Sequence, residues 1–251
     1  MKNKVAVVSG GSRGIGKAIC EGFATHGAKV AVNYAEEADC DYPDAAQDVV
    51  DTIVANGGEA VAFEANMEDK SAIDQMVKGV LERWGKIDIM VANAGVCPFE
   101  EFLRIDELLM DKVVSVNQIG AFFLAQACAR SMIEIKIPGR LVFISSVSSI
   151  FGGELQIHYT ATKGAMNQMM KSIAIAVGKY GITANAVLPG TVITDINRFQ
   201  LEDEAPELKE YFVKRTPIGR LAKPEDIANA ALFFASDDAS AVSGATLIVD
   251  G

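Results

Sequence analysis

The chain has 251 residues, a formal net charge of -10 and two histidines. Half of its residues are hydrophobic, which is enough to fill the core of one α/β domain over residues 1–251 without disulfides or metals. The acidic balance disfavours a nucleic-acid partner and an anionic membrane surface, because both require a cationic face. We expect no targeting segment, and no apolar stretch that reaches the roughly 18 residues of a membrane helix. These features favour a cytoplasmic protein that acts on a small molecule.

The four cysteines are Cys20, Cys40, Cys97 and Cys128, and no two of them form a C-x-x-C pair. Neither a metal site nor a disulfide framework is therefore expected.

Short apolar runs alternate with longer stretches of helical period along the whole chain. This alternation is typical of a parallel sheet that helices cover on both faces. The predicted strands are 5–9, 29–33, 60–65, 87–92, 140–145, 183–188 and 246–249. The predicted helices are 14–25, 45–56, 71–84, 105–135 with a break, 158–179 and 224–235. Because no repeat or linker interrupts the pattern, we expect a single domain.

Two segments, 36–44 and 191–216, do not fit the alternation. The second follows the sixth predicted strand. Loops after strand carboxyl ends are where an open α/β sheet holds its ligands. Residues 191–216 are therefore a candidate substrate lid.

A glycine-rich turn, Ser9–Gly16, joins the first strand to the first helix and reads SGGSRGIG. Such a turn lets the backbone approach a pyrophosphate, whose charge then lies at the positive end of the helix. The glycine spacing differs from G-x-G-x-x-G. The position between a strand and a helix nevertheless favours nucleotide binding.

The end of the second strand favours NADP over NAD. Enzymes that prefer NAD usually carry an acidic residue about 20 positions after the turn, where it binds the ribose 2′-hydroxyl. This chain has Asn33, Tyr34 and Ala35 there, while Arg13 in the turn can pair with a 2′-phosphate. An acidic run just beyond would oppose that phosphate if its loop folded back, namely Glu36, Glu37, Asp39 and Asp41. We expect NADP, with NAD still possible.

Three side chains form a candidate proton-transfer site. Tyr159 and Lys163 are four residues apart and share one face of a predicted helix. The lysine ammonium should lower the pKa of the phenol, which makes proton transfer feasible near neutral pH. Ser146, at the end of the fifth strand, can bind a substrate oxygen. The pattern indicates an oxidoreductase that moves a hydride between nicotinamide and a secondary alcohol or its carbonyl partner.

The whole chain resembles the short-chain dehydrogenase/reductase family. The matching motifs are Ser9–Gly16, Asn93-Ala94-Gly95, Asn117, Ser146, Tyr159-x-x-x-Lys163 and Pro189-Gly190. Three positions depart from the usual pattern, namely Ser9 for Thr, Ala92 for Asn and Asn66 for Asp. The resemblance implies a Rossmann-type, doubly wound sheet of seven parallel strands, and a homotetramer packed through its long helices.

The resemblance also implies the site residues. The implied catalytic tetrad is Asn117, Ser146, Tyr159 and Lys163, in which Lys163 also binds the nicotinamide ribose and Asn117 holds a water of the proton relay. The implied cofactor contacts are Gly10, Ser12, Arg13, Gly14, Ile15, Gly16, Asn33, Tyr34, Ala35, Asn66, Met67, Asn93, Ala94, Gly95, Tyr159, Lys163, Pro189, Gly190, Thr191, Ile193 and Thr194.

Polar side chains near Tyr159 favour a sugar substrate, because sugar hydroxyls both donate and accept hydrogen bonds. The predicted substrate contacts are Ser146, Glu154, Gln156 and Tyr159. Further polar residues on the two bordering segments are His158, Asp195, Asn197 and Arg198. Cys97 is expected to line the site without reacting. Segments 97–99, 152–159 and 191–197 are similar to those of L-rhamnose 1-dehydrogenases, which oxidise the anomeric carbon of a free sugar.

Two alternatives stay open. The first is a 3-oxoacyl-carrier-protein reductase or a broad carbonyl reductase, for which Lys136, Arg140 and Lys179 could supply a cationic patch toward the acidic carrier. The second is a nucleotide-sensing regulator without catalysis. The presence of Tyr159 and Lys163 together disfavours the regulator.

Overall fold

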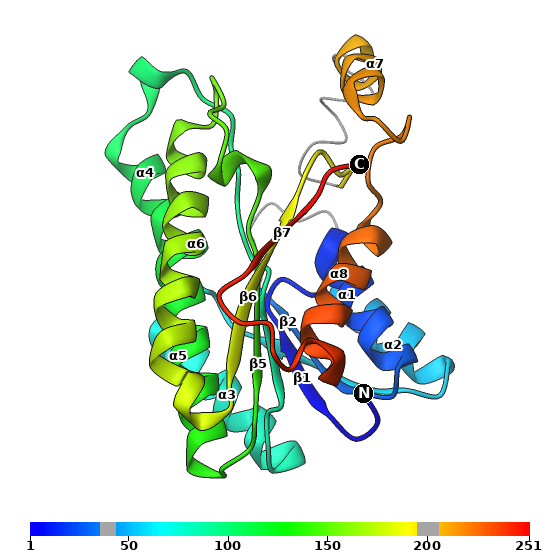
Figure 1. Ribbon diagram of the computed structural model, residues 1–251. Coiled ribbons are helices and arrows are strands. Elements are labelled where there is room, and N and C mark those ends of the chain that lie inside the picture. Colours follow the sequence, from blue (N-terminus) through cyan, green and yellow to red (C-terminus); the bar gives the residue numbers. More distant parts are fainter. Residues whose placement is uncertain (36–43, 195–205) are drawn as a thin grey trace.

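The computed structural model describes residues 1–35, 44–194 and 206–251 (Figure 1). Its centre is a seven-stranded parallel sheet in the order β3-β2-β1-β4-β5-β6-β7. The strands are β1 (Val5–Val8), β2 (Lys29–Tyr34), β3 (Glu59–Glu64), β4 (Ile89–Ala92), β5 (Arg140–Ile144), β6 (Thr183–Pro189) and β7 (Thr246–Val249). Each predicted strand overlaps its observed counterpart. The predicted doubly wound sheet and single domain are confirmed.

Two layers of helices cover the sheet. One face carries α1 (Gly14–Thr25), α2 (Ala45–Ala55) and α8 (Pro224–Ala235), and the other carries α3 (Lys70–Trp84), α4 (Glu107–Val114), α5 (Ala121–Glu134) and α6 (Ile157–Val177) (Figure 1). The central strands β1, β4 and β5 are buried at every residue. Strands covered on both faces have no polar side, which is why these strands read as continuous apolar runs.

A helix that the sequence does not predict, α7 (Pro206–Arg215), lies inside the proposed lid segment 191–216. It stands beyond the carboxyl ends of the strands, apart from the two helical layers (Figure 1). Residues 195–205 of the same segment lie outside the described residues.

The predicted break in helix 105–135 is a π-helical turn at Ser115–Gly120, between α4 and α5. Gly120 is helical, with φ -60°. A Cβ at Gly120 would lie 2.4 Å from the carbonyl oxygen of Met67. The turn therefore packs directly on the loop after β3, and this packing leaves no room for a side chain.

One element contradicts the expectation that no stretch is long and apolar enough for a membrane span. Helix Glu107–Glu134 meets that criterion by length and composition. Its buried residues Leu124, Cys128 and Met132 belong to the same core cluster as residues of β4 and β5, as expected for the core helix of a globular domain. The expectation failed because charged residues at the ends of the helix hide its apolar middle.

Replacement of Gly120 by Ala should lower the free energy of unfolding by about 1–3 kcal/mol, because the new Cβ must displace the Met67 backbone. Gly178→Ala is the matched control, since Gly178 is also helical and has nothing within 4 Å of its Cβ position. Thermal unfolding of both variants measures the difference. Equal melting temperatures would show that the turn and the Met67 loop are not in tight contact.

Candidate active site

Two loops meet where the strand order reverses, between β1 and β4. The Ser9 hydroxyl accepts hydrogen bonds from the backbone N–H groups of Asn93 and Ala94, both at 3.0 Å. The Asn93 amide donates back to the carbonyl oxygens of Ser9 (2.9 Å) and Gly10 (3.0 Å). Serine keeps the hydroxyl that threonine provides elsewhere in the family, so the departure at Ser9 preserves this junction. Crevices at such a reversal bind ligands in open α/β sheets.

The turn between β1 and α1 fits a dinucleotide pyrophosphate. A Cβ at Gly16 would lie 2.0 Å from the Gly10 carbonyl oxygen, so only glycine fits there. Arg13, the N-cap residue, makes no side-chain capping bond, and the first turn of α1 contains no acidic residue. The positive end of this 12-residue helix is thus not neutralised by its own cap or first turn, as anion binding requires.

Asn33 has a different task from the predicted one. Its side chain is buried, and its Oδ1 accepts a hydrogen bond from the Gly10 N–H at 3.1 Å. Its Nδ2 donates to the carbonyl oxygens of Tyr34 (3.1 Å) and Ala65 (3.0 Å). Because these groups use the amide hydrogens, we revise the role of the Asn33 side chain from cofactor contact to support of the turn.

The other predicted cofactor residues follow the strand carboxyl ends. Tyr34 is half-buried and Ala35 is exposed after β2. After β3, exposed Asn66 accepts a hydrogen bond from the Glu68 N–H at 2.9 Å, and Met67 is buried. The acidic run Glu36, Glu37, Asp39 and Asp41 lies outside the described residues.

The segment after β6 returns to the glycine-rich turn. The Gly190 N–H donates to the Val249 carbonyl at 3.0 Å, and Val192 forms a β-bridge with Ala222. A Cβ at Gly14 would lie 3.3 Å from the Thr194 methyl group. Thr194 therefore packs against the turn, beside half-buried Thr191 and Ile193.

The structure brings Ser146, Tyr159 and Lys163 together as the sequence predicts. Ser146 follows β5 and forms a side-chain hydrogen bond with Tyr159 on α6. The Lys163 ammonium is buried, lies 5.5 Å from the centre of the Tyr159 ring and donates to the Ile144 carbonyl at 2.8 Å. The Ser145 hydroxyl donates to the Lys163 carbonyl, which ties α6 to the end of β5.

Asn117 connects this group to the loop after β4. From the π-helical turn, its Oδ1 accepts from the Val96 N–H (2.8 Å) and its Nδ2 donates to the Val96 carbonyl (2.9 Å). The same amide reaches the Thr162 hydroxyl at 3.3 Å, and that hydroxyl donates to the Tyr159 carbonyl at 2.7 Å. The sequence analysis missed Thr162. Its position three residues after Tyr159, on the same helix face, is the signal that could have identified it.

The pKa of Tyr159 moves opposite to the predicted direction. Burial raises it, Cys97 adds to the rise, and the hydrogen bond from Ser146 offsets part of it. Burial also lowers the pKa of Lys163 to about 8, with Cys97 acting against that change. Desolvation is therefore the main cause of both pKa shifts. Tyr159 is a neutral phenol at pH 7, ready to donate a proton.

The predicted substrate contacts differ in placement. Gln156 forms a side-chain hydrogen bond with Cys97. The positive charge of Lys163 acts to lower the pKa of the Cys97 thiol. Burial raises the pKa of Cys97 to about 11, although Lys163 and Gln156 lower it, so the thiol stays neutral at pH 7. Glu154 is exposed. Asp195, Asn197 and Arg198 lie outside the described residues.

His158, on one of the segments expected to border the substrate, faces the protein interior. It is fully buried, and its Nε2 lies 2.9 Å from the Pro98 carbonyl oxygen. Its position next to Tyr159 turns it toward the protein interior, because consecutive helical residues point to different sides.

Comparison with known proteins agrees with this geometry. A family model described as Enoyl-(Acyl carrier protein) reductase matches residues 10–251. An L-rhamnose 1-dehydrogenase (NAD(P)(+)) of Sphingomonas sp. (strain SKA58) is 45% identical over 251 residues, 100% of this chain and 96% of that protein. An L-rhamnose 1-dehydrogenase (NADP(+)) of Thermoplasma acidophilum is 44% identical over 250 residues, again 100% and 96% of the two chains.

Among solved structures, a short-chain type dehydrogenase/reductase from Mycobacterium marinum superimposes with a TM-score of 0.91 at 27% identity. The match covers 100% of this chain and 95% of that one. From the family model, the relatives and the shared fold, the chain belongs to the short-chain dehydrogenase/reductase family of oxidoreductases.

Proposed function

We propose that the protein is an NADP-preferring sugar dehydrogenase that oxidises the anomeric carbon of L-rhamnose or a related aldose, with NAD as a poorer cofactor. The observation that carries this proposal is the Gln156 amide, hydrogen-bonded to Cys97 beside Lys163. An amide both donates and accepts, as sugar hydroxyls require. The two L-rhamnose 1-dehydrogenase relatives support the same substrate class.

Different residues of the site would bind the cofactor and the substrate. The turn from Gly10 to Gly16, the loop 93–95, Lys163 and the segment 189–194 would hold the cofactor. When bound, its nicotinamide takes up the hydride in oxidation and returns it in reduction. The substrate hydroxyl would bind Ser146 and Tyr159. In oxidation the phenol must first release its own proton to solvent, and the resulting phenolate then takes the hydroxyl proton as the hydride leaves the same carbon. The C1–O bond of the sugar becomes a carbonyl, and the product is a lactone.

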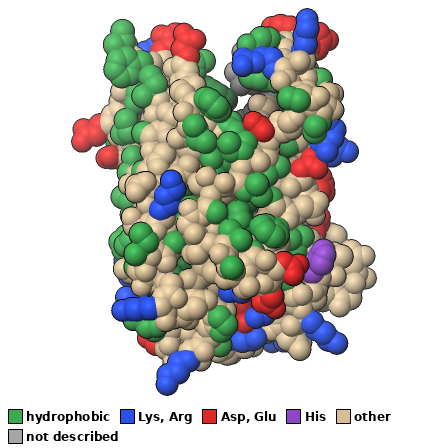
Figure 2. Space-filling model, in the orientation of Figure 1, with side chains coloured by type: hydrophobic (Ala, Val, Ile, Leu, Met, Phe, Trp, Pro, Cys, Tyr) green, Lys and Arg blue, Asp and Glu red, His purple; other side chains and the backbone are tan. Residues whose placement is uncertain are grey.

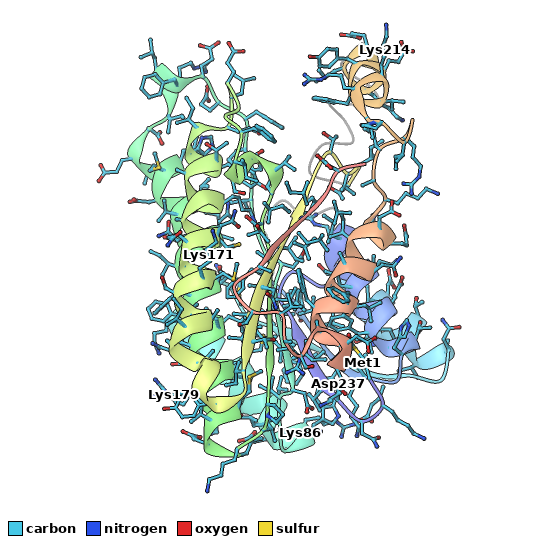
Figure 3. The ribbon with its side chains drawn as sticks, in the orientation of Figure 1. Met1, Lys86, Lys171, Lys179, Lys214 and Asp237 are labelled. Atoms are coloured by element: carbon cyan, nitrogen blue, oxygen red, sulfur yellow. The ribbon has the colours of Figure 1, made fainter. Side chains whose placement is uncertain are left out.

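The carrier-protein alternative is less well supported. Arg140 is buried and donates to the carbonyl oxygens of Gly139 and Ser236, so it cannot join a cationic patch. Lys179 lies at the end of the molecule away from α7 and the strand carboxyl ends (Figure 3). The regulator alternative is also less well supported, because a protein that only senses a nucleotide does not need a buried lysine beside Tyr159.

We infer further that the protein works in the cytoplasm on a small molecule, without a nucleic-acid or membrane partner, and as a homotetramer. The outer face of α5 and α6 supports the assembly, because an apolar groove there is lined by Phe122, Ala129, Ile133 and Ile173. Apolar surface of this kind is usually covered by a partner. The mass in solution tests this inference.

Residues 191–216 remain our proposal for the substrate lid. Figure 2 shows a notch in the surface between α7 and the opposite side of the molecule, which carries α4 and α6. Phe102 and Phe151, and Tyr211 on α7, have exposed aromatic side chains.

Tyr159→Phe should abolish turnover and leave cofactor binding nearly intact, because it removes only the hydroxyl that carries the proton. Steady-state kinetics and cofactor titration measure the two effects, and Tyr180→Phe, an exposed tyrosine far from the site, is the control. Lys163→Ala should weaken both. Retention of more than about a tenth of kcat in Tyr159→Phe, a loss below about 1.4 kcal/mol, would contradict the proposed role.

The kcat/KM should be higher with NADP than with NAD, because Arg13 can pair with the 2′-phosphate. Arg13→Ala should reduce the preference by about tenfold or more, the usual cost of a lost charge-assisted bond. Arg83→Ala removes the same charge at the end of α3, where Arg83 pairs with Glu59, and should leave the preference unchanged. Equal or better use of NAD by the unmutated protein would instead mean that the acidic run after Ala35 controls selectivity.

L-rhamnose and related aldoses should give a higher kcat/KM than an acetoacetyl thioester or an aryl ketone. Gln156→Ala should raise KM for the sugar about tenfold and leave KM for the ketone unchanged, because the ketone has no hydroxyl to lose. Glu154→Ala should have a smaller effect, since Glu154 is exposed. Exposed Gln168, also on α6, provides the control Gln168→Ala. Turnover of the thioester or ketone without turnover of any sugar at millimolar concentration contradicts the proposal.

A further inference from the structure

Two segments beside Tyr159 are joined into one unit, residues 96–100 and 153–158, which we call the pocket wall. Cys97 is hydrogen-bonded to the Gln156 side chain. The Glu100 N–H donates to the Leu155 carbonyl at 3.0 Å. Between these two contacts, His158 Nε2 lies 2.9 Å from the Pro98 carbonyl oxygen. The loop after β4 is thereby bonded at three places to the segment that leads into α6 and to the start of that helix.

Of the residues that make these three contacts, only His158 is fully buried. A carbonyl oxygen only accepts, so Nε2 carries the hydrogen and donates it to Pro98. Its Nδ1 is buried and has no hydrogen-bond partner in the described part of the chain. An apolar side chain would fill the same space without an unpaired buried polar atom, which is costly. What histidine adds at this position is the bond to Pro98.

That bond acts close to the reacting group. His158 immediately precedes Tyr159, and Pro98 immediately follows Cys97. Displacement of Pro98 would shift Cys97, and with it the Gln156 amide that we propose as a sugar contact. Val96, on the other side of Cys97, is already fixed by two hydrogen bonds with Asn117. Cys97 is therefore held between two anchored neighbours.

We propose that His158 is a positioning residue that holds residues 96–100 against residues 153–158 within the pocket wall and so sets which substrates bind, without taking part in proton transfer. The consequence for sugar selectivity rests on the proposed function. The mechanical part, the anchoring of Cys97, does not. The two parts are therefore tested by separate measurements.

The kinetic test compares His158→Phe with His158→Gln. Glutamine can bring its Nε2 close to the position of the imidazole Nε2 and so retain a donor for Pro98, whereas phenylalanine fills the space without one. We expect His158→Phe to raise KM for L-rhamnose about tenfold or more, the loss of about one buried hydrogen bond, with kcat and KM for NADP nearly unchanged. His158→Gln should recover most of the loss. A fall in kcat at constant KM, or no change in either, would overturn the proposal.

The mechanical test uses the thiol of Cys97. In a Cys40→Ser background, N-ethylmaleimide should modify mainly Cys97, because Cys20 and Cys128 are buried. Cys97→Ser in the same background checks that assignment. We expect His158→Phe to increase the rate of modification about tenfold and His158→Gln to leave it unchanged. An unchanged rate in folded His158→Phe would refute the anchoring.

If His158→Phe does not fold, His158→Asn replaces it in both measurements. Asparagine is one methylene shorter than glutamine, and its amide should fall short of the Pro98 carbonyl. The expected pattern is then fast modification with Asn and slow modification with Gln. If the unmutated protein oxidises no aldose, the sugar proposal fails while the modification rates still decide the role of His158. If the sugar reacts and neither measurement separates the variants, only the His158 proposal fails.

Discussion

The structure of the site depends on the junction between the loops that follow β1 and β4. The strand order reverses there, and helices leave toward opposite faces of the sheet, so no regular hydrogen bonding joins the two loops. The Ser9 hydroxyl and the Asn93 amide supply the missing bonds to the backbone of Asn93, Ala94, Ser9 and Gly10. Asn33 in β2 completes the junction, because its Oδ1 accepts a hydrogen bond from the Gly10 N–H. Without these side chains, partly buried backbone groups would lack partners, and the start of α1 would not be fixed toward the crevice.

A second side-chain amide, that of Asn117, also joins two segments by hydrogen bonds to backbone groups. Asn117 bonds both backbone groups of Val96 and reaches Thr162, so one amide joins the loop after β4 to the helix that carries Tyr159. The π-helical turn contains Asn117, and Gly120 at its end packs on the Met67 backbone. Wider turns of this kind often occur at functional sites because they alter the direction of a side chain within a helix. Position in the site is thus set by side-chain amides that bond to backbone, rather than by charge pairs.

The sequence predicted what local patterns determine. Continuous apolar runs predicted the strands, the glycine turn predicted the start of α1 at Gly14, and the spacing of Tyr159 and Lys163 predicted a shared helix face. It did not predict α7, because half of Pro206–Arg215 is charged and its apolar side chains from Leu208 to Val213 span less than two helical turns. Nor did it predict the tasks of Asn33 and His158, whose partners Gly10 and Pro98 are 23 and 60 residues away in the sequence. The pKa of Tyr159 was wrong in direction because burial arises from the whole fold and has no local signature.

Burial of both Tyr159 and Lys163 determines how protons can move through the site. The phenol has a raised pKa and is neutral at pH 7, so it can donate to a developing alkoxide directly when a carbonyl is reduced. In the direction of alcohol oxidation it must first lose its own proton. The pKa of Lys163, about 8, is much closer to neutral pH, so the lysine exchanges protons far more readily than the phenol does. Its Nζ is 5.5 Å from the phenol ring centre, near enough for its positive charge to stabilise a transient phenolate. If Tyr159 is the proton-transfer residue, as we propose, Lys163 would promote oxidation electrostatically when the proton leaves Tyr159, and it would do so best below the pH at which it loses its own charge.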